Sequence, residues 1–461
     1  MHKENDFRQV LERFEEMLEK RASYFFDVDE FELIIDHFLE IRNFRKAHNA
    51  VEIARKQHPQ SAEIIIKLIQ IYLENGNPAE ALSKIGELPS YEKENPEINL
   101  LRGTAYAQLG KIREAEKQFE IALANTEDDK VDILINISIA FENARKINLA
   151  VKYLRMAFDI EPNNLSVLYD LAYYYERLHN YQASIDFYNK YLDEDPYSDN
   201  VWYNLGIVYF KLNKTDKALE AYDFAIAVNP SYTSAYFNKA NLYANEGDYR
   251  KALKVYKDFL SLEPEHIQAW CYLGECYEEI AEYDLALEAY RKVIELDNAY
   301  GDGWFGLGLI YLAKEKYPEA IAHITKAIEF EKGNSDYWFN LAICYEKSNS
   351  NQEAIRCYLH TVSLDTKDKE AWENLAILYL AEHQFSEAMH VLIRANDENP
   401  EDAQIIYLTA ACFFRIGDQK NGINFLKKAL GLDRGLIEVF YKAYPEAKNE
   451  KQIHKLINSP G

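Results

Sequence analysis

Residues 199–230 read DNVWYNLGIVYFKLNKTDKALEAYDFAIAVNP. In the first half of this stretch, large apolar side chains recur at intervals of three and four residues: Trp202, Leu205 and Tyr209. Such intervals place side chains on one face of an α-helix. The second half has its own helical pattern: Ala218, Tyr222 and Ala225. Pro230 ends this pattern because proline has no amide proton. The stretch therefore predicts a helical hairpin.

The same pattern recurs along the chain with a period of 34 residues. Tryptophans mark the period, since they are separated by multiples of 34: Trp202, Trp270, Trp304, Trp338 and Trp372. Extending the period in both directions predicts twelve units, one of which has 35 residues: 28–61, 62–95, 96–130, 131–164, 165–198, 199–232, 233–266, 267–300, 301–334, 335–368, 369–402 and 403–436. We number the positions of a unit from its first residue.

Three positions keep one kind of side chain in most units. Position 11 is aromatic in all twelve, so we expect a large ring to fill the interior of each hairpin. Position 20 is alanine in ten units, with Ser184 and Gly422 as the exceptions, and position 8 is glycine, alanine or serine in ten. Small side chains at these two positions indicate that two helix backbones approach each other closely there.

These residues and their spacing resemble the tetratricopeptide repeat family, over residues 28–436. The resemblance implies an all-α fold, a right-handed superhelical solenoid of antiparallel helix pairs whose neighbours bury each other's apolar faces. Solenoid ends need caps. We predict an N-terminal capping helix in residues 1–27, with apolar residues at helical spacing: Phe7, Leu11, Phe14 and Leu18. Capping helices in residues 437–461, around Phe440, are predicted at the other end. Docking of a partner is the alternative role for the N-terminal helix.

Composition restricts location and partners. The chain has 76 acidic and 52 basic residues, a net charge of −24. This charge repels a phosphate backbone and favours neutral or basic protein segments, so we predict no nucleic-acid partner. No apolar run approaches the roughly 20 residues that span a bilayer, and the N-terminus lacks the apolar core of a signal peptide. We therefore predict no membrane partner and a cytoplasmic location.

The family resemblance implies that positions 2, 5, 6, 9, 12 and 13 of the first helix line an inner, concave surface. Position 6 holds asparagine or aspartate in six units: Asn136, Asp170, Asn204, Asn238, Asn340 and Asn374. An asparagine amide both donates and accepts, so it can hold a peptide unit of any sequence. The row resembles the asparagine ladders of superhelical tetratricopeptide proteins that grip a partner's backbone. The alternative is that these are solvated polar side chains.

Position 5, next to this row, is aromatic in six units: Tyr169, Tyr203, Phe237, Phe305, Phe339 and Tyr407; Cys271 takes this position between Phe237 and Phe305. Exposed rings beside amides suit a peptide with apolar anchors. Packing between repeats is the alternative interpretation. The carboxylate clamp known in the family needs lysine at position 5, which no unit has.

Two motifs are interpreted as coincidental. Gly301, Gly303 and Gly306 form GxGxxG, but a dinucleotide site needs a preceding strand, and a helix is predicted there. We interpret these glycines as loosening the start of the hairpin, and hypothesise a flexible point at residues 301–308. His383 falls in an inter-helix turn, and its spacing to His390 does not indicate a metal site.

The five cysteines form no CxxC pair, and three of them share position 10: Cys276, Cys344 and Cys412. We interpret these as small core residues.

The sequence thus predicts a non-catalytic scaffold or adaptor that binds an extended peptide or a disordered partner segment in its groove. We predict no catalytic residue, no cofactor and no metal site. Two alternatives are a structural scaffold that associates with itself and an accessory subunit of an enzyme complex.

Overall fold

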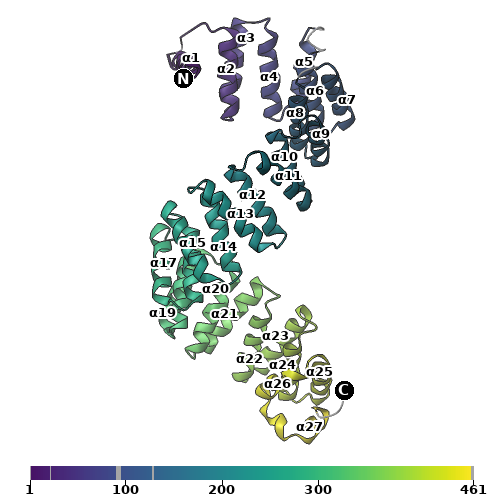
Figure 1. The fold of residues 1–461 in the computed structure, drawn as a ribbon. Helices are drawn as coiled ribbons and strands as arrows, with labels where there is room; N and C mark the ends of the chain where they lie inside the picture. The colour runs from purple at the N-terminus through teal and green to yellow at the C-terminus, as the bar shows by residue number, and fades with distance from the viewer. Residues whose placement is uncertain (1, 21, 90–94, 127–128, 458–461) are drawn as a thin grey trace. The chain divides into compact units, whose positions relative to one another are not determined.

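The computed structural model describes residues 2–20, 22–89, 95–126 and 129–457, without the side chains of residues 2–7, 452 and 455. These described residues form helices joined by short turns, and no strand (Figure 1). The chain divides into two compact units, Met1–Pro230 and Ser231–Gly461. Each unit is a stack of antiparallel helix pairs, so the predicted all-α solenoid is confirmed.

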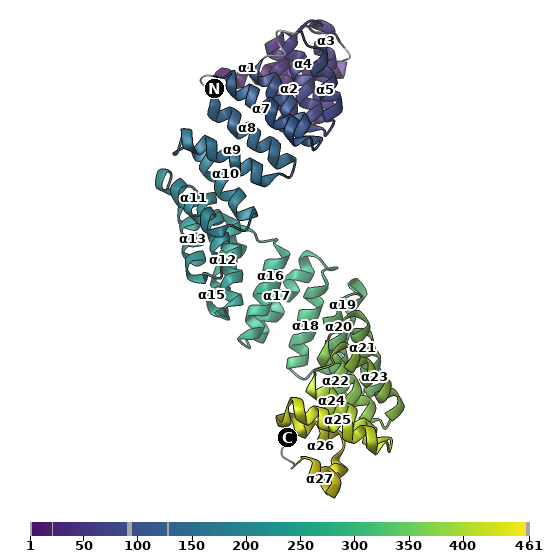
Figure 2. The ribbon, with the colours of Figure 1, turned by 90° about the vertical axis from the view of Figure 1, so that its right-hand side faces the viewer.

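Every hairpin has a first and a second helix. The first helices are α2 (Val28–Glu40), α4 (Ala62–Glu74), α6 (Pro96–Gln108), α8 (Lys130–Asn143), α10 (Leu165–Arg177), α12 (Asp199–Lys211), α14 (Thr233–Asn245), α16 (Ile267–Glu279), α18 (Gly301–Ala313), α20 (Ser335–Lys347), α22 (Lys369–Ala381) and α24 (Ala403–Arg415). The second helices are α3 (Phe44–Gln57), α5 (Pro78–Glu87), α7 (Ile112–Ala124), α9 (Ile147–Ile160), α11 (Tyr181–Glu194), α13 (Thr215–Val228), α15 (Tyr249–Leu262), α17 (Tyr283–Leu296), α19 (Tyr317–Phe330), α21 (Asn351–Leu364), α23 (Phe385–Glu398) and α25 (Gln419–Leu432). Within a unit, each second helix packs on the first helix of the next hairpin, as α9 does on α10 (Figure 2).

In five hairpins, tryptophan at position 4 forms a hydrogen bond to the preceding hairpin. The indole Nε1–H donates to the backbone carbonyl at position 32 of the preceding hairpin over 2.8–3.0 Å, with these acceptors: Pro196, Pro264, Asn298, Lys332 and Thr366. The rings also stack on second-helix side chains of their own hairpins, as Trp338 does on His360 at 4.3 Å between ring centroids. These contacts explain why tryptophan recurs with the period of the repeat.

The turn inside each hairpin has one backbone conformation. Position 15 has a positive φ in every hairpin from α2 to α25, at Gly76, Gly110, Gly247 and Gly417 and also at eight other residues: Arg42, Arg145, His179, Asn213, Ala281, Glu315, Asn349 and His383. Left-handed backbone is unfavourable for residues with a Cβ. The packing of the two helices therefore imposes this turn, and it places His383 in a turn, as predicted.

Small side chains are needed at positions 20 and 8 for different reasons. Position 20 is fully buried between the helices of its hairpin, as predicted. At position 8, however, the obstacle is a side chain rather than a second backbone. A Cβ at Gly103, Gly206 or Gly274 would lie under 3.0 Å from the ring at position 24 of the same hairpin.

Position 24, rather than position 11, fills the hairpin interior. Its side chain is almost fully buried in all of the hairpins: Val51, Ile85, Phe119, Leu154, Tyr188, Tyr222, Tyr256, Tyr290, Ile324, Tyr358, Leu392 and Leu426. Most position 11 rings, including Tyr175 and Tyr209, are only partly buried. The expectation for position 11 was therefore wrong in most hairpins, because the second helix already supplies the central side chain.

The two ends of the chain pack on their neighbouring hairpins. In α1 (His2–Lys20), Phe14 and Met17 are buried, and the Phe14 ring lies edge-on to Phe26 at 5.8 Å. Leu11 and Leu18 are partly buried there, and the Phe7 side chain is outside the described residues.

After α25, the chain forms η2 (Arg434–Leu436), α26 (Ile437–Ala443), η3 (Pro445–Asn449) and α27 (Lys451–Ile457). Phe440 of α26 is fully buried, and its ring lies 5.7 Å from Phe414 of α24. The rest of the predicted cap, residues 458–461, lies outside the described part of the chain.

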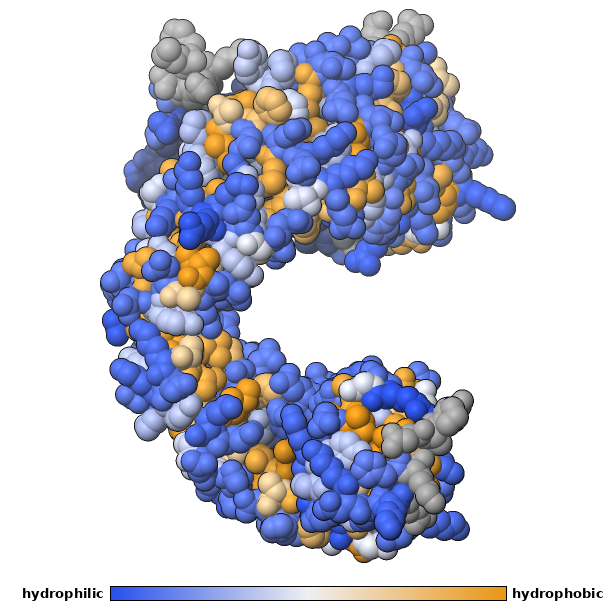
Figure 3. Space-filling model, turned by 60° about the horizontal axis from the view of Figure 1, so that its bottom comes forward, coloured by the Kyte–Doolittle hydropathy of each residue, from blue (hydrophilic) through white to orange (hydrophobic). Residues whose placement is uncertain are grey.

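Hydrophilic residues cover most of the visible surface, with hydrophobic residues scattered between them (Figure 3). Among the described helices, none combines the length and the apolar composition that a membrane span requires. All five cysteines are buried as free thiols, which confirms the interpretation of Cys276, Cys344 and Cys412 as core residues.

Candidate functional site

In the N-terminal unit, three of the position 6 residues predicted to bind peptide follow one another on α8, α10 and α12. Asn136 is exposed, and Asp170 and Asn204 are partly buried. The Asn204 amide Nδ2 donates to the Tyr169 hydroxyl over 3.0 Å. An asparagine amide has two N–H donors and a carbonyl oxygen. The bond to Tyr169 uses one N–H, so it orients the side chain while the amide keeps further capacity for hydrogen bonds.

Asp170 is the one acid in this row, and its pKa is raised to about 6. Burial is the main cause, and the negative charge of Glu142 on α8 adds to it. Glu142 itself accepts a hydrogen bond from Tyr174 at 2.7 Å and pairs with Arg177. The Asp170 carboxyl therefore takes up a proton more readily than an ordinary aspartate, and in its protonated form it can donate as well as accept a hydrogen bond.

The position 5 rings of the N-terminal unit are also partly buried. Tyr169 lies edge-on to Tyr188 at 6.2 Å and to Tyr191 at 6.3 Å, and Tyr203 lies 5.9 Å from Tyr222. Each ring thus rests on a second-helix ring of its own hairpin and keeps part of its surface exposed. Both sequence-based interpretations are therefore partly right: one side of each ring packs against its own hairpin, and the rest of the ring is exposed.

In the C-terminal unit, Asn238, Asn340 and Asn374 are partly buried at position 6 of α14, α20 and α22. The Asn340 amide donates to the Asp336 carbonyl of its own helix over 2.9 Å. All three amides are thus partly accessible, and that of Asn340 is already oriented by a hydrogen bond, as that of Asn204 is.

Three predicted rings of the C-terminal unit are partly buried, whereas two other members of the stripe are not accessible in the same way. Phe237 packs on Phe259 and Tyr272, Phe305 on Tyr337 at 4.6 Å, and Phe339 on Tyr358 at 5.7 Å. By contrast, Tyr407 is fully buried and donates to the Asp433 carbonyl, and Cys271 is 3% exposed. The aromatic stripe is therefore shorter than the sequence suggests.

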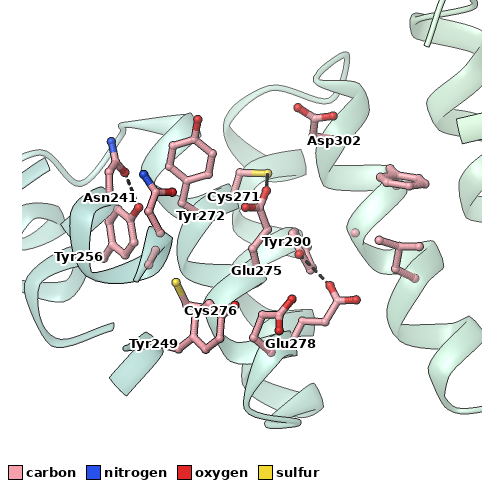
Figure 4. Close-up of a pocket in the computed structure, with 16 residues that line it drawn as sticks. Asn241, Tyr249, Tyr256, Cys271, Tyr272, Glu275, Cys276, Glu278, Tyr290 and Asp302 are labelled. Carbon is pink, nitrogen blue, oxygen red and sulfur yellow. Dashed lines mark hydrogen bonds between the residues drawn. The ribbon is translucent and has the colours of Figure 1, made fainter. Parts of the chain in front are cut away.

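The row of position 6 amides is interrupted at α16 and α18, where Tyr272 and Gly306 take their place. A recess of about 680 Å³ lies at this point, lined by residues of α14 to α18 (Figure 4). Its described lining is Asn241, Ala244, Asn245, Tyr249, Tyr256, Cys271, Tyr272, Glu275, Cys276, Glu278, Glu279, Tyr290, Asp302, Phe305, Gly306 and Leu309. Most of these occupy the positions that the family resemblance assigns to the inner surface.

Gly306 makes room for the floor of the recess. A Cβ at Gly306 would lie under 3.0 Å from three carbons of the Tyr290 ring, and one at Gly274 would also collide with that ring. Gly303 and Gly308 likewise sit against Val293 and Ile324, inside a continuous helix α18. Close packing, rather than a loosened helix start, therefore explains these glycines.

The electrostatics of the recess are acidic. Glu275 is solvent-accessible, but the concave walls partly desolvate its carboxyl, and this effect together with the charge of Asp302 raises the pKa of Glu275 to about 7. Burial raises the pKa of Glu278 as well. The thiol of Cys271 contacts Glu275 at 3.8 Å, and Tyr290 donates to Glu278 over 3.2 Å.

Sequence reasoning did not single out these acids as a site. Glu275 and Glu278 are at positions 9 and 12, which the resemblance assigns to the inner surface, so a count of acids at these positions could have found them. Asp302, at position 2, could have been found in the same way. The contribution of Tyr256 and Tyr290 could not, because position 24 is a core position elsewhere.

The fold defines an all-α repeat protein built from stacked helical hairpins. A family model described as tetratricopeptide repeat matches residues 33–89, 100–164, 135–199, 237–301, 279–335 and 305–360, and a second model with the same description matches residues 200–232. These matches cover more than half of the sequence, and the chain therefore belongs to the tetratricopeptide repeat family. No curated protein sequence matches it significantly.

Solved structures match this chain at low sequence identity. The C-terminal part of a tetratricopeptide repeat protein from Cytophaga hutchinsonii is 19% identical, with a TM-score of 0.44, and the match covers 52% of this chain and 99% of that one. The Cut9-Hcn1 hetero-tetramer of the APC/C is matched at 16% identity and a TM-score of 0.40, over 84% of this chain and 96% of that one. YrrB, described as having an unusual peptide-binding site, is matched at 20% identity and a TM-score of 0.34, over 40% and 95%.

Proposed function

We propose that this chain is a non-catalytic scaffold that binds an extended, neutral or basic segment of a partner protein along the inner wall of its first helices. Tetratricopeptide repeat proteins generally mediate protein–protein interactions. The observation that supports the finer proposal is the row of accessible, oriented amides at position 6, next to rings at position 5.

The two sets of side chains have different roles in this proposal. Amides such as Asn204 and Asn340 hold peptide units, which gives direction without reading sequence. Rings such as Tyr203 and Phe339 offer apolar surface to side chains of the partner, which supplies affinity. Because neighbouring residues already orient these groups, little conformational entropy is lost on binding.

The absence of catalysis is part of the proposal. Burial raises the pKa of all five cysteine thiols, so none is activated as a nucleophile. We further propose that α1 and the segment from α26 to α27 are caps, a role supported by the burial of Phe14 and Phe440 against the terminal hairpins.

A titration with matched variants tests the binding proposal. A partner segment is identified by affinity purification from the native cell and mass spectrometry, synthesised, and titrated against the full chain, an Asn204→Ala plus Asn238→Ala variant, and a control. The control is Asn189→Ala plus Asn424→Ala, which removes two exposed amides from second helices.

We expect the inner-wall variant to bind at least tenfold more weakly, because each lost hydrogen bond contributes about 1 kcal/mol. The control should bind as the unaltered chain does. Equal affinity of the two double variants, with unchanged helix content, would refute binding along the position 6 row.

A further inference from the structure

We propose that the recess lined by α14, α16 and α18 binds an arginine side chain of the partner segment. This inference rests on the proposed function, and it identifies one side chain of the partner that the first helices would recognise by its charge. The site lies entirely in the C-terminal unit, between hairpins that pack directly on one another.

The first argument is the charge of the recess. Its described lining includes four acids, Glu275, Glu278, Glu279 and Asp302, and no lysine, arginine or histidine. Three lysines of the same hairpins pair with acids outside the recess: Lys251 with Asp248, Lys292 with Glu295, and Lys314 with Asp284. Because the described lining has no basic side chain, a cationic guest would relieve the repulsion between its carboxylates.

The second argument is how these carboxylates are held. Glu278 accepts from the Tyr290 hydroxyl over 3.2 Å, and Asp302 accepts from the Tyr337 hydroxyl over 2.5 Å. Each of these oxygens has a neutral donor that fixes its position but does not neutralise its charge. Glu275 has only a weak donor, the thiol of Cys271.

The third argument is the aromatic surface around the acids. Five of the sixteen lining residues are aromatic: Tyr249, Tyr256, Tyr272, Tyr290 and Phe305. Figure 4 shows Tyr256 and Tyr272 on one side of Glu275, and Tyr290 beside Glu278 on the other. The rings of Tyr256 and Tyr272 are 6.2 Å apart. Tyr249, Tyr272 and Phe305 are partly exposed, whereas Tyr256 and Tyr290 are 1% exposed and lie beneath them. A planar guanidinium stacks on partly exposed rings, and its forked donors reach several carboxylates at once.

The site also fits its place in the row of amides. At α16 and α18, position 6 holds Tyr272 and Gly306, so the row offers no amide where the acids gather. Because Gly306 has no side chain, the Tyr290 ring can enter the floor and reach Glu278. In this proposal, the position 6 amides of the other first helices hold the peptide backbone, whereas α16 and α18 accept a charged side chain. A volume of about 680 Å³ is ample for one.

A bound metal ion is a less suitable occupant. Among the described residues, no group of three or more acids, histidines and cysteines is arranged to hold one. The carboxylates come from α16 and α18 and are separated by rings, which suits a wide, flat cation better than a compact ion.

The test uses the peptide Gly-Ser-Ala-Arg-Ala-Ser-Gly, isotope-labelled at the guanidinium. Its ends are acetylated and amidated, so that the arginine carries its only charge. The full chain is titrated into it while the guanidinium signal is followed by nuclear magnetic resonance. The same titration is made with citrulline in place of arginine, followed by its side-chain amide signal, because citrulline keeps the shape and removes the charge.

Three variants are compared with the unaltered chain. Glu275→Gln plus Glu278→Gln removes two charges from the recess, and Glu282→Gln plus Glu295→Gln removes two from other parts of the same hairpins. Asn340→Ala plus Asn374→Ala removes amides of the proposed backbone-binding row. Circular dichroism verifies that all of them keep their helix content.

We expect the arginine peptide to bind at least tenfold more tightly than the citrulline peptide, and to lose this advantage only in the recess variant. Equal binding of the two peptides by the unaltered chain, or an unchanged advantage in the recess variant, would overturn the arginine site. The asparagine variant separates the two proposals. If it weakens both peptides alike while charge has no effect, the amide row stands and the arginine site fails.

Discussion

Replacing Gly306 by alanine tests whether the glycines of α18 are there for close packing. Gly306 is buried where the Tyr290 ring of α17 packs against α18. The added methyl group would lie under 3.0 Å from three carbons of that ring, and Gly274 limits its retreat on the other side. The variant therefore forces the ring, or one of the two helices, to move.

Two opposing effects determine how much Gly306→Ala changes the free energy of unfolding. Overpacking a buried site costs about 1–3 kcal/mol, whereas alanine in place of glycine stabilises a helix by about 1 kcal/mol. Because the clash is with a rigid ring held on both sides, we take the upper part of the first range. The net loss expected for Gly306→Ala is about 2 kcal/mol.

Native-state hydrogen exchange measures this effect where it occurs, through the opening free energies of amides in α17 and α18. The matched control is Gly431→Ala, an exposed helical glycine whose Cβ would meet nothing within 4 Å. It should be neutral or stabilising by up to about 1 kcal/mol.

A double-mutant cycle isolates the clash. Tyr290→Leu replaces the ring with a side chain that occupies position 24 in other hairpins, such as Leu392. In that background Gly306→Ala should no longer be destabilising, so the coupling should reach about 1–3 kcal/mol. A stabilising effect of Gly306→Ala in the unaltered chain would refute the packing explanation and return these glycines to a role in flexibility.

Three further predictions follow from other contacts. Trp338→Phe should destabilise its hairpin by about 1 kcal/mol in chemical denaturation, because the hydrogen bond to the Lys332 carbonyl is lost while an aromatic ring remains. Ser184→Ala should raise the denaturation midpoint by an amount equivalent to about 1 kcal/mol, since the buried Ser184 hydroxyl has no hydrogen-bond partner in the described structure. Arginine-peptide affinity should fall several-fold between pH 8 and pH 6 in the titration described above. Protonation of Glu275, whose pKa is about 7, removes charge from a recess that it shares with Glu278, Glu279, Asp302, Cys271 and the lining tyrosines.

The sequence predicts the fold well because the repeat multiplies a weak local signal. One copy of the pattern at Trp202 indicates a hairpin, and its recurrence every 34 residues also fixes where the other helices begin. The left-handed turn at position 15 was not predicted, because most units have a residue other than glycine there, such as Ala281 or Glu315. Tertiary packing decides that conformation against local preference.

The candidate site could be predicted only in part. Periodicity places Asn204 and Tyr203 on the first helix, but it does not reveal that Asn204 is bonded to Tyr169 or that Tyr407 is buried. The recess depends on the Tyr290 ring crossing between hairpins over Gly306, which is a three-dimensional relation with no periodic signature. Exposure and cross-hairpin contacts therefore had to come from the structure.

Site-specific photo-crosslinking tests the central claim, that partners lie along the first helices, most directly. A photoreactive phenylalanine is introduced in place of Tyr203 on the inner wall or, as a control, of Phe224, which is exposed on the second helix of the same hairpin. After illumination in the native cell, adducts are identified by mass spectrometry. We predict that residue 203 captures extended partner segments and residue 224 does not. Adducts at residue 224 alone would contradict the account.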